Sequence, residues 1–289
     1  MRNNGEDRLF LRPPPGFQVS RLPLGPGNMR LVHGGQGPPL VLIHGLGGSS
    51  EDFFQIAPFM ARERTLFMPD LLGSGDSDKP DAPYTMDWFL EIILQMQEYL
   101  GLGRAAWLGH SMGGLLCLRL AQRRPDLVDR VIAVCPAGGH AKLLLRWRLL
   151  RDFLVDRNGR LRIRWLTPLR LYIPLVLFNE WSPMAQNFSR RFIRRWQGSQ
   201  ADLLERAFVR SALSVFNSPF WPQAGQLTRP VLMITGRSDL ITTWEQTRRL
   251  ARHLPPDRIL LELGGGHMLP YTHARELCRA ALDFCRQPR

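Results

Sequence analysis

A serine, an aspartate and a histidine in this chain of 289 residues stand in surroundings that suit nucleophilic catalysis, and they occur in that order. Ser111 stands in Gly109-His110-Ser111-Met112-Gly113, and Asp239 and His267 each follow an apolar run. A serine hydroxyl becomes a nucleophile when a histidine accepts its proton and a carboxylate orients that histidine. The sequence therefore predicts an acyl-transfer triad with Ser111 as nucleophile, His267 as base and Asp239 as the orienting acid.

The elements around these residues support that interpretation. Residues 105–108 are an apolar run that predicts a buried strand, and residues 115–121 predict a helix, so Ser111 stands at a tight strand-to-helix turn. Asp239 and His267 come just past the predicted strands 231–235 and 259–263, at the edge where open α/β sheets place their sites. The alternative position for the acid, after the preceding strand, offers no carboxylate in residues 136–141.

The tetrahedral intermediate of acyl transfer also needs donors for its oxyanion. We expect them to be the backbone N–H groups of Met112, at the start of the helix, and of Leu46, in the glycine-rich loop that follows an apolar run. His44 is interpreted as a residue that shapes this loop rather than as a second base. A similar loop-ordering role is expected for four residues further along the chain: Asp70, Gly73, Gly75 and Ser77.

The whole chain alternates strand and helix signals, which predicts an α/β fold whose parallel sheet is covered on both faces. Helices are expected over 51–62 (capped by Ser49 or Ser50), 85–100, 244–254 and 271–286, and further strands over 17–22, 29–32, 39–43, 65–68 and 131–135. The alternation stops between residues 135 and 230, which is far longer than an ordinary crossover. We therefore divide the chain into a loose segment 1–16, a core of 17–137 and 223–289, and an insertion 138–222.

The motifs resemble those of the α/β-hydrolase superfamily. The resemblance rests on five segments: His44-Gly45-Leu46-Gly47, Asp70-Leu71-Leu72-Gly73-Ser74-Gly75-Asp76-Ser77, Gly109-His110-Ser111-Met112-Gly113-Gly114, Gly236-Arg237-Ser238-Asp239 and Gly266-His267. It implies an α/β-hydrolase fold with an eight-stranded, mostly parallel sheet, an inserted helical cap, a covalent acyl-enzyme and no cofactor. Ser111 argues against epoxide hydrolases and haloalkane dehalogenases, which carry aspartate at that position. The chain departs from the family after the acid, where it has Leu240-Ile241-Thr242-Thr243 without the frequent proline.

The chain carries a formal charge of +13, and most of it lies in one region. Residues 138–222 hold fifteen Lys and Arg against five Asp and Glu, together with five of the eight tryptophans. A solvated basic face is one interpretation, and peripheral contact with anionic lipid or amphiphilic substrates is the other. No DNA-reading motif appears, so nucleic acid is not an expected partner.

The cysteines and the N-terminal segment indicate the compartment. Cys117, Cys135, Cys278 and Cys285 show neither CxxC pairs nor metal-ligand spacing, so buried thiols and no metal are expected. The N-terminal segment lacks the apolar region of a signal peptide, and no run is long enough to span a bilayer. A cytoplasmic protein is the default expectation.

These features together favour a carboxylic-ester hydrolase acting on small-molecule esters with an apolar acyl group. The resemblance also allows a carbon–carbon bond hydrolase of vinylogous diketones, and in third place a perhydrolase. A ligand receptor or partner-binding module built on the same fold is the alternative outside enzymes.

Overall fold

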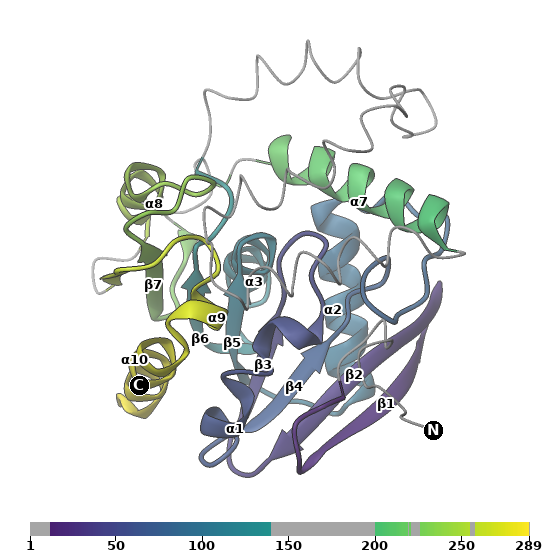
Figure 1. Cartoon of the computed structure of the whole chain (residues 1–289), viewed down its shortest axis with the longest axis horizontal. Helices are drawn as coiled ribbons and strands as arrows, with labels where there is room; N and C mark the ends of the chain where they lie inside the picture. The colour runs from purple at the N-terminus through teal and green to yellow at the C-terminus, as the bar shows by residue number, and fades with distance from the viewer. Residues whose placement is uncertain (1–11, 140–199, 219, 221–225, 255–257, 289) are drawn as a thin grey trace, which may run out of the picture.

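The computed structural model describes residues 12–139, 200–218, 220, 226–254 and 258–288. Eight strands form one twisted sheet in the order β1-β2-β4-β3-β5-β6-β7-β8 (Figure 1). The strands are β1 Phe17–Leu24, β2 Gly27–Gly35, β3 Pro39–Ile43, β4 Thr65–Pro69, β5 Ala105–His110, β6 Val128–Val134, β7 Val231–Gly236 and β8 Ile259–Leu263. The β1–β2 and β2–β4 pairs are antiparallel and every other pair is parallel, which confirms the predicted sheet.

Helices cover both faces of this sheet (Figure 1). The longer described helices are α2 Met86–Tyr99, α3 Met112–Arg123, α7 Ala201–Phe216, α8 Trp244–Ala251 and α10 Ala274–Arg286, and the short ones are η2 Ser50–Phe53, α1 Ala57–Met60 and α9 Leu269–Thr272. Helices α2, α3 and α8 bury their apolar sides in one core around Trp107. Helices α1 and α10 build a second core on the opposite face, around Phe53 and Leu277. Strands β5 and β7 are buried along their whole length because both cores contact them.

Two helix predictions were wrong in their extent. In place of one helix over 51–62 the chain forms η2, a turn and α1, because Pro58 has no N–H to donate and its ring would clash within a continuous helix. Ser49 stands at the N-cap of η2, but its side chain makes no capping hydrogen bond. The Ser50 hydroxyl accepts a hydrogen bond from the buried Arg30 guanidinium. The terminal helix is divided into α9 and α10 at His273, whose backbone leaves the helical region.

Most of the predicted insertion 138–222 lies outside the described residues, and so do its five tryptophans and residues 1–11 of the predicted loose segment 1–16. Helix α7 is described, and it lies across α2 and the loop before it (Figure 1). The Arg210 guanidinium contacts the Asp81 carboxylate at 2.6 Å, and the Ser214 hydroxyl accepts the Met86 N–H at 2.8 Å. These contacts fix the C-terminal end of the insertion to the core.

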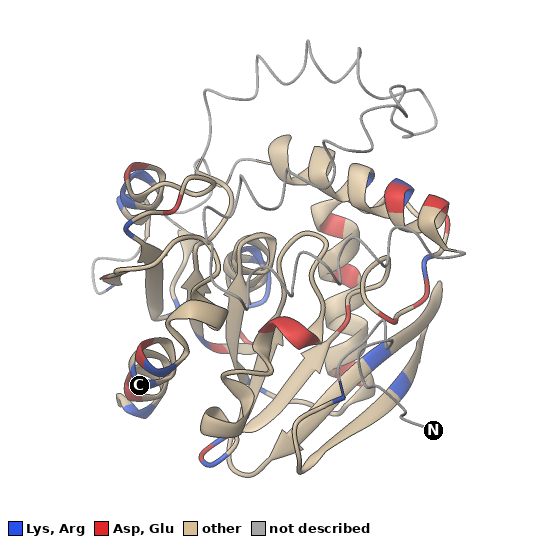
Figure 2. Ribbon diagram, viewed as in Figure 1, with Lys and Arg blue, Asp and Glu red and all other residues tan. Residues whose placement is uncertain are grey.

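Charge is mixed in sign over the described helices (Figure 2). The described part of the insertion is neutral, since Asp202 and Glu205 balance Arg206 and Arg210. The basic excess of residues 138–222 therefore lies at positions outside the described ones. Among the described helices, none is long and apolar enough to cross a membrane. The four cysteines are buried thiols that form no disulfide, as predicted.

Candidate active site

Ser111 occupies the sharp turn that the sequence predicts between a strand and a helix. It stands between β5 and α3 with φ 54° and ψ −114°, a backbone conformation that side-chain-bearing residues rarely adopt. Its N–H donates to the Val134 carbonyl at 2.9 Å, and its own carbonyl accepts the Ala137 N–H at 3.0 Å. The neighbouring strand β6 thus holds the strained residue in place at the N-terminus of α3.

Close backbone packing explains the glycines on either side of Ser111. A Cβ atom at Gly109 would lie 2.2 Å from the Gly113 carbonyl oxygen, and one at Gly113 would lie 2.0 Å from the Ile43 carbonyl oxygen. Both contacts are with backbone atoms, which cannot move aside as the end of a flexible side chain can. Glycine is therefore required at positions 109 and 113 because α3 lies so close to β3 and β5.

Substituting Gly113 by alanine is expected to destabilise the protein by more than about 3 kcal/mol, because the overlap with β3 outweighs the roughly 1 kcal/mol gained in helix propensity. The matched control is Gly103→Ala, since a Cβ atom at Gly103 meets nothing within 4 Å. Urea unfolding of both variants measures the difference. Equal stability of the two would contradict the packing account.

The glycine-rich loop after β3 lies directly against Ser111. A Cβ atom at Gly45 would be 3.2 Å from the Ser111 Cβ, and the loop is a tight turn in which Gly48 donates to the Gly45 carbonyl at 3.1 Å. The strand order reverses at β3, which pairs with β4 on one side and β5 on the other. Leu46 and Met112 therefore stand at the switch point where α/β sheets bind ligands.

His44 shapes that loop, as predicted. Its Nε2 accepts the Leu71 N–H at 3.0 Å, so its Nδ1 carries the ring proton and donates to the Gly45 carbonyl at 2.7 Å. Both ring nitrogens are thus engaged by backbone groups, and the side chain is fully buried. His44 joins the loop after β3 to the loop after β4.

Asp239 and His267 are brought together by the loops that follow β7 and β8. The His267 Nδ1 lies 2.8 Å from the Asp239 Oδ2, and both residues are buried. The Asp239 Oδ1 accepts the N–H groups of Ile241 and Thr242, and its Oδ2 accepts the Thr242 hydroxyl at 2.7 Å. Burial would raise the pKa of Asp239, but the bonds from His267 and Thr242 outweigh it and lower the pKa.

The missing proline after the acid also has a structural explanation. Thr243 is the N-cap of α8, where its hydroxyl accepts the Gln246 N–H and its own N–H donates to the Gln246 side chain. This capping box uses a backbone N–H that proline does not have. The loop that carries Asp239 is therefore anchored by hydrogen bonds at Thr243.

His110 links the turn at Ser111 to the loop that carries His267. Its Nε2–H donates to the His267 carbonyl at 2.8 Å, and the two imidazole rings lie 4.9 Å apart. Burial, followed by the proximity of His267, lowers the pKa of His110 to about 3. His110 therefore remains neutral at physiological pH. The sequence motif contains this residue, but nothing in the sequence predicts its partner.

Because His110 is neutral in the folded protein, we expect the protein to lose stability in acid. Unfolded His110 takes up a proton near pH 6.5 whereas the folded residue does not until about pH 3, so stability is lost as pH falls between these values. In His110→Gln, whose amide can still donate to the His267 carbonyl, we expect the loss between pH 6.5 and 5.5 to be smaller by about 1 kcal/mol. Urea unfolding at the two pH values measures it, and the same loss in both proteins would contradict the assignment.

A buried ion pair supports the loop after β4. The Arg30 guanidinium lies 3.2 Å from the Asp70 Oδ2 and donates to the Ser50 hydroxyl at 2.7 Å. Asp70 also accepts the N–H groups of Ser50 and Asp76. Burial would raise the Asp70 pKa, but Arg30 and these bonds outweigh it and lower the pKa. Asp70 is thus a loop-ordering residue, as predicted, and Arg30 is the partner that the sequence analysis missed.

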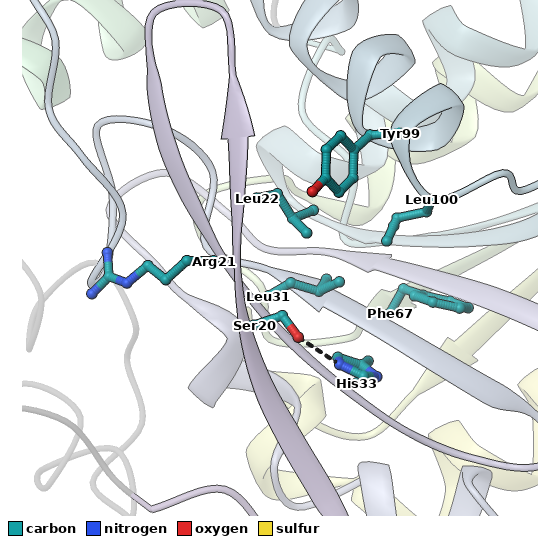
Figure 3. Close-up of a pocket in the computed structure, with 8 residues that line it drawn as sticks. All are labelled: Ser20, Arg21, Leu22, Leu31, His33, Phe67, Tyr99 and Leu100. Atoms are coloured by element: carbon teal, nitrogen blue, oxygen red, sulfur yellow. Dashed lines mark hydrogen bonds between the residues drawn. The ribbon is translucent and has the colours of Figure 1, made fainter.

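A separate hollow lies on the outer strands, beside the end of α2 (Figure 3). Its volume is about 380 Å³, and it is lined by Ser20, Arg21, Leu22, Leu31, His33, Phe67, Tyr99 and Leu100. The Ser20 hydroxyl lies 2.9 Å from the His33 Nε2, and none of the eight lining residues is acidic. This serine–histidine pair therefore lacks the carboxylate that orients a catalytic histidine.

Comparisons with known proteins agree with this architecture. The sequence profile of the alpha/beta hydrolase fold family matches residues 38–274. The chain belongs to this family. A putative carbamate hydrolase of Pseudomonas savastanoi is 27% identical over 249 residues, which cover 86% of this chain and 93% of that protein.

Two solved structures show the same fold at low identity. An esterase from Thermogutta terrifontis superposes with a TM-score of 0.75 at 19% identity, covering 93% of this chain and 98% of the other. A 2-hydroxy-6-oxo-6-phenylhexa-2,4-dienoate hydrolase from Rhodococcus superposes with a TM-score of 0.74 at 21% identity, covering 94% and 99%. At these identities the two structures show the fold alone, and it is the sequence profile that places this chain in the alpha/beta hydrolase family.

Proposed function

We propose that this hydrolase cleaves carboxylic esters with an apolar acyl group through a Ser111–His267–Asp239 triad. The observation that carries the proposal is the buried 2.8 Å hydrogen bond between Asp239 and His267, on a loop that His110 ties to the strained turn of Ser111. An imidazole oriented by a carboxylate, on a loop held to the turn of a partly buried serine, is the arrangement that activates a hydroxyl nucleophile.

The chemistry follows from the hydrogen bonds of His267. Its Nδ1–H donates to Asp239, which leaves the Nε2 lone pair to accept the Ser111 proton as the hydroxyl attacks the ester carbonyl. The Leu46 and Met112 N–H groups stabilise the oxyanion. The imidazolium then protonates the leaving alcohol, and in the second half-reaction His267 activates a water that hydrolyses the acyl-enzyme.

The test is a panel of p-nitrophenyl esters of graded chain length, combined with fluorophosphonate labelling followed by peptide mapping. We expect the label on Ser111 and a preference for longer acyl chains, because residues 138–222 are rich in Leu, Phe and Trp. A chain that neither hydrolyses these esters nor reacts with the probe would overturn the proposal and favour a ligand-binding role.

The relatives suggest which other substrates belong in the panel. An aryl carbamate and a vinylogous diketone represent the activities named for the Pseudomonas and Rhodococcus proteins. Both contain a carbonyl group that the same serine could attack. If kcat/KM for either exceeds that for every ester, the ester assignment is wrong although the triad assignment stands.

We also propose peripheral contact with anionic membranes through the insertion. Residues 138–222 contain ten more basic than acidic residues and five tryptophans, a composition suited to an anionic lipid surface. In sedimentation at low salt, we expect the protein to pellet with vesicles containing anionic lipid and to remain in the supernatant with neutral ones. Equal partitioning between the two vesicle types would exclude this contact.

A further inference from the structure

Three side chains that can bind a metal ion converge on the buried side of His267. They are Cys135 after β6, Asp239 after β7 and His267 after β8, and their ligand atoms all lie within 4.8 Å of one another. All three residues are buried. The mechanism proposed above uses the aspartate and the histidine, but it does not involve the thiol of Cys135.

The backbone holds Cys135 in a fixed position beside the pair. Cys135 has φ 44°, a value unusual for a residue with a side chain, and its N–H donates to the Ile234 carbonyl at 2.7 Å. Its carbonyl lies 3.1 Å from the Thr242 hydroxyl, and its Sγ lies 4.0 Å from the Gly266 carbonyl oxygen. The thiol is therefore directed toward the loop that carries His267.

We propose that Cys135, Asp239 and His267 form an inhibitory site for a thiophilic divalent cation such as Zn²⁺ or Cd²⁺. Sulfur, imidazole nitrogen and carboxylate oxygen are zinc ligands, and this donor set disfavours Mg²⁺ and Ca²⁺, which prefer oxygen alone. A thiolate and a carboxylate also neutralise a divalent cation, so the occupied buried site has no net charge.

The side chains need only modest movement to reach zinc geometry. Tetrahedral coordination at ordinary bond lengths sets the ligand atoms about 3.3 to 3.6 Å apart. The His267 Nδ1 and Asp239 Oδ2 would separate from their present 2.8 Å, and the Cys135 Sγ, whose ligand distances are within 4.8 Å, would adjust to the same spacing. The Thr242 hydroxyl oxygen lies 3.4 Å from that Nδ1 but only 2.7 Å from that Oδ2, so it would have to move away from the carboxylate to serve as the fourth ligand.

The cation would disable the base by fixing the wrong tautomer of His267. It replaces the proton on Nδ1, that proton passes to Nε2, and the thiol proton is released to solvent, so that one proton leaves for each cation bound. With Nδ1 on the metal and Nε2 protonated, the ring has no lone pair to accept the Ser111 proton. This inhibition rests on the proposed catalytic role of His267, whereas binding of the cation does not.

The experiment compares Cys135→Ala with Cys278→Ala, the same change at another buried cysteine. Each protein is incubated with Cd²⁺, and the cadmium–thiolate charge-transfer band, the bound stoichiometry and the ester turnover relative to the metal-free sample are recorded. We expect wild type and Cys278→Ala to bind one Cd²⁺ with a thiolate band, to lose turnover and to recover it with a chelator. In Cys135→Ala we expect no band and at least about a tenfold higher inhibitory concentration.

Three results would overturn the proposal: no thiolate band in wild type, a band that persists in Cys135→Ala, or equal inhibition of both alanine variants. Cys135→Ser, which keeps the size of the side chain, replaces the alanine variant if the latter fails to fold. If wild type binds Cd²⁺ at Cys135 but never hydrolyses an ester, the proposed function has failed and the metal site stands. If wild type hydrolyses esters but binds no Cd²⁺, the metal site has failed and the proposed function stands.

Discussion

Replacing Ser111 by alanine is expected to lower kcat for p-nitrophenyl ester hydrolysis by about 10⁴-fold or more, because the variant lacks the hydroxyl that we propose forms the acyl-enzyme. The residual rate would come from the proposed oxyanion donors, the N–H groups of Leu46 and Met112, which the substitution does not remove. Steady-state kinetics on a purified variant measures the effect, and loss of fluorophosphonate labelling accompanies it.

The matched control for this variant is Ser20→Ala. The Ser20 hydroxyl lies 2.9 Å from the His33 Nε2, but this pair is in the hollow on the outer strands, far along the sheet from the turn of Ser111. Its turnover is expected to equal that of the wild type. A large loss of kcat in Ser20→Ala together with a small loss in Ser111→Ala would contradict the proposal, because it would place the catalytic serine on the outer strands.

The second large effect is expected from Asp239→Asn, a drop in kcat of about 10³- to 10⁴-fold with little change in fold. The side-chain oxygen must remain at the Oδ1 position, since it accepts the N–H groups of Ile241 and Thr242 there. The amide NH₂ then faces the His267 Nδ1 and donates to it, so the ring proton is held on Nε2, where it blocks the uptake of the Ser111 proton.

Thr242 makes this substitution structurally tolerable. Its hydroxyl, which donates to the Asp239 Oδ2 at 2.7 Å, can turn to the Cys135 carbonyl at 3.1 Å instead. We therefore expect urea unfolding midpoints of variant and wild type to agree closely while the kinetics differ. Near wild-type kcat in Asp239→Asn would show that another group orients His267.

Much of the fold was predictable because its signals are local. The apolar strands 39–43 and 231–235 are continuous runs, and the turn of Ser111 carries its own glycines. The oxyanion and triad residues remain predictions about function, although Asp239 and His267 do lie in hydrogen-bond contact. The cap remains an expectation because most of residues 138–222 lie outside the described part of the chain.

Contacts that depend on which strands are neighbours could not be predicted from the sequence. Cys135 approaches His267 only because β6, β7 and β8 are neighbours whose ends meet at one edge. Arg30 did carry a readable signal: a charged residue inside the apolar run Met29-Arg30-Leu31-Val32 requires a buried partner, and Asp70 was already identified as an acid at a strand end. Pro58 likewise predicts the interruption between η2 and α1.

The pairing of β6 with β7 has a consequence for how this chain folds. Val134 pairs with Ile234, so residues 135–230 must be looped out before the sheet can be completed. While that segment is still unfolded, closing a loop roughly eight times longer than an ordinary crossover costs about 2 kcal/mol more in chain entropy. The contact of Arg210 with the segment before α2 and that of Ser214 with the first residue of α2 shorten that loop once α7 has docked. Docking of α7 would therefore speed the addition of β7 and β8, the strands that deliver Asp239 and His267, and the site would be the last part of the protein to assemble.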